Sequence, residues 1–138
     1  MFKKILAPVD LAHQGALAKA LKCTADLANQ YDAEVVFVGV TAATPSSLAH
    51  NPQEYGEKLA AFAAAQGQEH GFRASSHPVV SHDPTADLDD ALLKATGETG
   101  ADLVVMASHL PNVLDHVWPS NGGKIAEHAK CSVFVVRP

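Results

Sequence analysis

The apolar positions of the chain fall into two patterns, short continuous runs and longer segments whose apolar residues recur with the period of a helix. A continuous apolar run of about four to eight residues is typical of a strand buried on both faces, and a stripe at helical spacing is typical of an amphipathic helix. The runs predict strands at 4–9, 34–40, 74–80, 103–107 and 132–137. The stripes predict helices at 16–31, 52–68, 83–99 and from 120 or 121 to 129.

Proline, glycine and acidic residues indicate where these elements end. Pro8 marks the end of the first strand. Gly71 and Gly100 stand where the second and third helices are expected to stop, because glycine readily adopts the left-handed conformation that ends a helix. Asp83 followed by Pro84 predicts the start of the third helix, with the acid as its N-cap. The other segments are expected to be turns or loops, at 11–15, 41–50 and 107–119.

Strands and helices alternate strictly along the chain, which is the pattern of a parallel sheet with helices on both faces. The length of 138 residues suits one α/β domain spanning residues 1–138. In such sheets a ligand binds beyond the carboxyl ends of the strands, where the strand order reverses. The candidate binding segments therefore follow the first, second and fourth strands, at 8–10, from 41 onward and at 107–119.

Composition narrows the function classes. Apolar residues make up 47% of the chain and charged residues 18%, as in a globular domain. The net charge is -5 and the basic residues are scattered, which argues against nucleic acid or an anionic membrane as the partner. No apolar run approaches the roughly 20 residues that span a bilayer, so we expect a cytoplasmic protein. Cys23 and Cys131 are expected to be small core residues and not a disulfide.

Histidine and serine residues raise the question of metal binding or catalysis. His109, His116 and His128 do not form the closely spaced pairs that are typical of zinc sites. Ser108 and His109 are adjacent in sequence, which does not give a hydrogen bond from nucleophile to base, and the chain has no Walker lysine. We therefore assign no metal ligand and no catalytic residue.

Four stretches of the chain resemble the universal stress protein family. They are KKILAPVD at the start, HDPTADLDDAL around the third helix start, ADLVVMASHLPNV in the middle and PSNGGKIAEHAKCSVFVVRP at the end. The resemblance covers nearly the whole chain. It implies an open parallel sheet of five strands in the order 3-2-1-4-5, a Rossmann-like fold of the type that binds adenine nucleotides.

The resemblance also implies a binding site for ATP or another adenine nucleotide, with Mg²⁺ as the only metal, carried by the nucleotide. For Asp10 the residues themselves leave a second interpretation open, in which the carboxylate caps a turn or the next helix. The implied contact residues follow the first, second and fourth strands and open the last helix: Pro8, Val9, Asp10, Val40, Thr41, Met106, Ala107, Ser108, His109, Ser120 and Asn121.

The glycine loop of ATP-binding family members is degenerate in this chain. Ala107, Leu110 and Pro119 stand at its three glycine positions, and the spacing before Pro119 is one residue short. Leu110 adds bulk, and Pro119 has no N–H to offer a phosphate. Ser120 keeps the position of the family's serine, at a helix start whose free N–H groups favour an anion. We expect ATP binding to be weak or absent.

The resemblance favours a small stress-response or signalling module that binds an adenine nucleotide (ATP, ADP or AMP) weakly. A nucleotide-independent protein-interaction module of the same fold, with a protein partner, is the alternative. A weak ATP hydrolase is the third hypothesis, and nothing in the sequence assigns it a general base.

Residues 132–137 carry an expectation about assembly. In the order 3-2-1-4-5 the last strand lies at an edge, and it has no charge until Arg137. Such an edge invites pairing with another chain, and family members commonly pair this strand. We expect a homodimer through residues 132–137.

Overall fold

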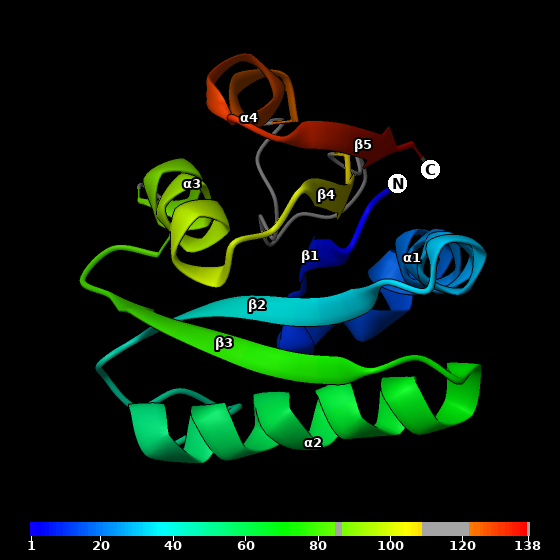
Figure 1. The fold of residues 1–138 in the computed structure, drawn as a ribbon. Coiled ribbons are helices and arrows are strands. Elements are labelled where there is room, and N and C mark those ends of the chain that lie inside the picture. Colours follow the sequence, from blue (N-terminus) through cyan, green and yellow to red (C-terminus); the bar gives the residue numbers. More distant parts are fainter. Residues whose placement is uncertain (85–86, 109–121, 138) are drawn as a thin grey trace.

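The computed structural model describes residues 1–84, 87–108 and 122–137. In these residues five parallel strands form one sheet in the order β3-β2-β1-β4-β5 (Figure 1). The predicted fold class and strand order are therefore confirmed. The strands are β1 (Lys4–Pro8), β2 (Glu34–Ala42), β3 (Ala74–Ser81), β4 (Leu103–Ala107) and β5 (Ser132–Val136). The helices are the 3₁₀ helix η1 (Leu11–Leu17), α1 (Ala18–Tyr31), α2 (Pro52–His70), α3 (Leu88–Thr99) and α4 (Gly122–His128).

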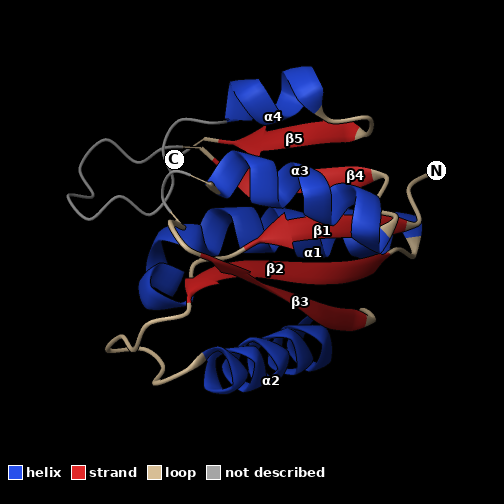
Figure 2. Cartoon of the chain, turned by 90° about the vertical axis from the view of Figure 1, so that its left-hand side faces the viewer, coloured by secondary structure: helices blue, strands red, loops and turns tan. Residues whose placement is uncertain are grey.

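The helices form two layers around the sheet. Helices α1 and α2 cover one face, and α3 and α4 cover the other (Figures 1 and 2). The chain first moves outward from β1 to β3 and then returns to the other side of β1 for β4 and β5. Since crossovers between parallel strands are right-handed, this change of direction moves the later helices to the opposite face.

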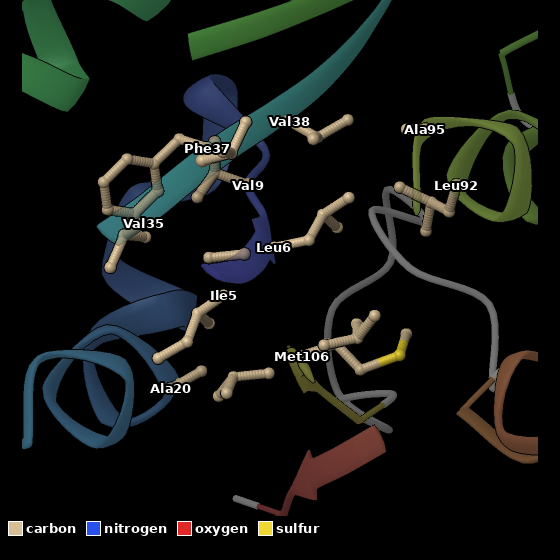
Figure 3. Packing of buried hydrophobic residues seen from close by; sticks show 14 of the residues in the cluster. Ile5, Leu6, Val9, Ala20, Val35, Phe37, Val38, Leu92, Ala95 and Met106 are labelled. Carbon is tan, nitrogen blue, oxygen red and sulfur yellow. The ribbon is translucent and has the colours of Figure 1, made fainter. Parts of the chain in front are cut away.

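The core lies on both faces of the central strands. Ile5 and Leu6 of β1 have no exposed surface. Figure 3 shows Ile5 directed toward Ala20 of α1 and Leu6 directed toward Leu92 of α3. Burial of each such side chain contributes about 1.5–3 kcal/mol. As predicted, β1, β2 and β4 are the inner strands and β5 lies at an edge.

Two predicted helix ends are confirmed by backbone conformation. Gly71 and Gly100 follow α2 and α3 with φ of 77° and 71°, in the left-handed region that glycine enters at little cost. At the other end of α2, the Asn51 side chain accepts the Glu54 N–H at 2.8 Å. This cap ends the connection from β2 and fixes where α2 begins.

The predicted start of the third helix is wrong. Helix α3 begins at Leu88, and Asp83 lies in the segment before it. The Ser81 hydroxyl accepts the Asp83 N–H at 3.2 Å and donates to the Asp87 carboxylate at 2.9 Å. These local bonds hold a turn at the point where an acid and a proline suggested a helix start.

The boundaries after β1 and β2 also differ from the predictions. Strand β2 continues beyond residue 40, with Thr41 paired to Val80 and Ala42 to Ser81. Pairing with β3 extends the strand here, beyond the apolar run that predicted it. The predicted turn at 11–15 is part of the 3₁₀ helix η1, and the following α-helix starts two residues later than predicted, at Ala18 instead of residue 16.

Candidate functional site

The end of β1 is recessed between its neighbours. Strand β1 ends at Pro8, whereas β2 continues past the partner of Pro8 as far as Ala42. On the other side, β4 ends at Ala107. All strands point the same way, so their carboxyl ends share this edge (Figure 2). The strand order reverses at β1. We call the edge beyond Pro8, flanked by residues 39–42 of β2 and 106–107 of β4, the β1 step.

The backbone of Val40 faces the β1 step. The Val9 N–H donates to the Val38 carbonyl at 2.8 Å, so Val38 presents its backbone groups toward β1. Alternate residues of a strand present these groups to the same side, so Val40 does too. No residue of β1 pairs with Val40, and in the described part of the chain no backbone group bonds it from that side. An adjacent donor and acceptor of this kind can bind the edge of a nucleobase.

Asp10 lies at the step and caps the next helix. One carboxylate oxygen, Oδ1, accepts the Ala12 N–H at 2.9 Å, and Asp10 is the N-cap of η1. The other oxygen, Oδ2, lies 3.5 Å from Nδ1 of His13, which is long for a hydrogen bond. The capping interpretation is therefore observed, and Oδ2 remains able to accept a hydrogen bond from a ligand.

The end of β4 forms the other flank. Met106 is buried and Ala107 half-buried. The Ser108 N–H donates to the Val136 carbonyl at 2.8 Å, which fixes the backbone as it leaves the strand. The Ser108 hydroxyl oxygen is buried and has no hydrogen-bond partner among residues 1–84, 87–108 and 122–137. A buried hydroxyl without a partner is costly, which makes Ser108 a candidate to bind a ligand or water.

Tyr55, near the N-terminus of α2, lies near the step and is not among the site residues that the sequence implied. It is 3% exposed, and its hydroxyl oxygen lies 2.0 Å from where a Cβ on Gly39 would stand. Burial raises the Tyr55 pKa well above its usual range, and the charge of Asp10 raises it further. The sequence feature that could have indicated this contact is Gly39, because a glycine inside an apolar strand often marks the close approach of another group.

The implied site residues are only partly placed by the structure. Pro8, Val9 and Asp10 lie at the end of β1, with Val40 and Thr41 on β2 across the step. Met106, Ala107 and Ser108 lie at the end of β4. The implied contacts His109, Ser120 and Asn121, and the loop positions Leu110 and Pro119, lie outside the described residues.

Within residues 1–84, 87–108 and 122–137, no group of three His, Cys, Asp or Glu residues has the geometry to hold a metal ion. Cys23 and Cys131 are free thiols, partly buried against the core. Burial is the main cause that raises the pKa of both thiols, which disfavours the reactive thiolate. None of the helices in this part of the chain is long and apolar enough to cross a membrane.

The fold and the β1 step place the chain among the doubly wound α/β proteins, whose carboxyl edge is the usual ligand site. Comparison with known proteins narrows this class. Universal stress protein G of Salmonella typhimurium is 27% identical over 99% of this chain and all of its own length. A universal stress family protein from Burkholderia pseudomallei has a similar structure, with a TM-score of 0.70, 23% identity and coverage of 97% and 95% of the two chains.

The profile of the universal stress protein family matches residues 1–137. The chain belongs to the universal stress protein family. A structural relative from Arabidopsis thaliana was solved with AMP bound, and its TM-score is 0.62 at 16% identity over 98% of this chain and 90% of its own. Two other relatives were solved with cAMP and, for one from Archaeoglobus fulgidus, with dAMP.

Proposed function

We propose that the chain is a stress-response module that binds an adenine nucleotide weakly at the β1 step. The observation that carries the proposal is the backbone of Val40, whose N–H and carbonyl face the step without a partner from β1. A nucleobase edge satisfies both groups. The AMP, dAMP and cAMP bound by structural relatives support adenine as the base.

The remaining residues at the step suit the sugar and the phosphate. Oδ2 of Asp10 can accept a ribose hydroxyl, and Ser108 can donate to a phosphate oxygen. The weak affinity follows from Leu110 and Pro119 in the sequence. The lost phosphate contact costs about 1.5–3 kcal/mol, or roughly ten- to a hundredfold in affinity.

Isothermal titration with adenosine, AMP, ADP and ATP tests the proposal. We expect dissociation constants weaker than about 10 μM. Val40→Pro removes the donor that faces the step and leaves the β3 ladder intact, because Val40 presents no group to β3. We expect this variant to lose about tenfold in affinity for every adenine ligand. Val80→Pro is the matched control, because its N–H faces outward on β3 and away from the step.

The competing hypotheses predict other results. If the wild-type chain binds no adenine compound and copurifies with none, the nucleotide-independent interaction module is the better interpretation. Release of phosphate from ATP that Asp10→Ala abolishes would favour the hydrolase. Tight ATP binding by the wild-type chain would contradict our account of Leu110 and Pro119.

A further inference from the structure

A buried carboxylate with an incomplete set of partners lies on α3. Asp89 is 8% exposed, and its Oδ1 is buried without a hydrogen-bond partner in the described part of the chain. Its Oδ2 lies 3.5 Å from the ammonium of Lys124 on α4. At that distance the two groups form an ion pair, but the separation is long for a hydrogen bond. Asp89 is therefore a buried negative charge that, among the described residues, Lys124 alone compensates, and only in part.

Asp89 belongs to the same edge of the sheet as the β1 step. It lies in the first turn of α3 and Lys124 in the first turn of α4. Each helix follows a parallel strand, so both first turns lie at the carboxyl ends of the strands. Ser108, which leaves β4 at this edge, also has a buried hydroxyl oxygen without a partner among the described residues.

The Lys124 ammonium can pair either with the Asp89 carboxylate or with a phosphate of the ligand. Its side chain is 53% exposed, whereas that of Asp89 is 11% exposed. A phosphate that enters at this edge attracts the exposed ammonium, but the buried carboxylate cannot follow it into solvent. The further the ammonium moves toward the ligand, the less Asp89 is compensated. The buried carboxylate then repels the ligand's charge through protein, where screening by salt is weak.

We propose that Asp89 makes the site select adenine ligands of low charge, so that adenosine and AMP bind better than ADP and ATP. The inference rests on the proposed function and adds the property that discriminates among its ligands. Each added phosphate brings more negative charge toward the same carboxylate. Asp89 is thus a specificity-determining residue that need not touch the ligand.

Titration of four ligands into three proteins tests the selection. The ligands are adenosine, AMP, ADP and ATP, without divalent cations and at constant ionic strength. The wild-type chain is compared with Asp89→Asn and with Asp90→Asn, which removes the same charge from the exposed neighbour in the same helical turn. We expect Asp89→Asn to bind ATP about tenfold more tightly and adenosine within about twofold of wild type. Asp90→Asn should leave the order of the four ligands unchanged.

Lys124→Met supplies a second variant, at a position whose side chain is half-exposed. It leaves Asp89 uncompensated, so we expect ATP affinity to fall about tenfold and adenosine affinity to stay unchanged. Selection by Asp89 is overturned if the wild-type chain already prefers ATP, or if Asp89→Asn shifts all four ligands equally. These results differ from failure of the proposed function, in which neither adenosine nor AMP binds to any of the proteins.

Discussion

Asp102 connects the start of the first strand to the start of β4. Its carboxylate accepts the backbone N–H of Lys3 at 2.9 Å and that of Lys4 at 3.1 Å. The Asp102 N–H donates in turn to the Lys4 carbonyl at 3.0 Å. A carboxylate that accepts two N–H groups makes stronger hydrogen bonds than a neutral acceptor, so this one residue fixes the alignment of two central strands.

We expect Asp102→Ala to lower the free energy of unfolding by about 1–3 kcal/mol, because two N–H groups lose their acceptor. Asp102→Asn retains one acceptor oxygen and should lose less. Urea unfolding at neutral pH measures both. Asp26→Ala is the control, since Asp26 pairs with Lys22 on the surface of α1 with 67% of its side chain exposed, and its midpoint should not change. Equal midpoints for Asp102→Ala and the wild type would contradict this role.

Because of Tyr55, we expect the free energy of unfolding to decrease at alkaline pH. Its pKa is raised in the folded chain, first by burial and then by the charge of Asp10, above the unfolded value of about 10. The folded state therefore keeps the phenolic proton where the unfolded chain has lost it. The contribution is fully present below pH ~10 and is lost as the pH rises further. We expect the urea midpoint to fall as the pH rises above ~10.

Tyr55→Phe should reduce that alkaline loss, because the variant has no phenol to ionise at this position. Tyr31→Phe is the matched control. Tyr31 is only partly buried, with its ring edge-to-face to Phe2 at 5.3 Å. The proposed origin is excluded if Tyr55→Phe and Tyr31→Phe lose stability with pH to the same extent.

At the scale of elements, apolar patterning predicted the strands because burial decides where they form. The run from Val35 to Val38 is buried on both faces, as its composition indicated. The last residues of β2 were missed because pairing with β3 extends the strand through Thr41 and Ala42, which are only partly buried. Pairing depends on the neighbouring strand, which a local pattern does not contain.

The candidate site, like the strands, was predictable from the sequence only in part. The resemblance indicated which residues follow the strands, including Asp10 and Val40. It did not indicate that the backbone of Val40 faces the step, because this depends on β2 being longer than β1. Nor did it indicate Asp89, whose burial depends on how α3 packs against α4 and the sheet. Geometry of this kind arises only when separate elements meet.

The two edge strands differ in their openness to another chain. On β3, the Arg73 carbonyl accepts from Val35 at 2.8 Å, so the odd-numbered residues face β2 and the even-numbered ones face outward. Pro78 is one of the outward residues and has no N–H, which interrupts pairing at this edge. On β5, the Val136 carbonyl accepts from Ser108, so Val133 and Val135 face outward with complete backbone groups.

For the whole molecule, we propose that two copies of the chain pair through residues 132–137. Two-fold pairing of β5 would satisfy the outward groups of Val133 and Val135 and form a continuous sheet across both copies. It would also bring together the two copies of Phe134, which is 45% exposed in the single chain. The support is the contrast between an open β5 edge and a β3 edge that Pro78 interrupts.

Sedimentation at micromolar concentration tests this assembly, and we expect the mass of a dimer. Val135→Pro removes one outward N–H without affecting the β4 ladder, because Val135 presents no group to β4. The variant should sediment as a monomer. Ser76→Pro makes the same change at an outward position of β3, so this control should remain a dimer. A monomeric wild-type chain, or a Val135→Pro chain that still dimerises, would show that β5 is not the interface, because its edge hydrogen bonds would then contribute nothing to association.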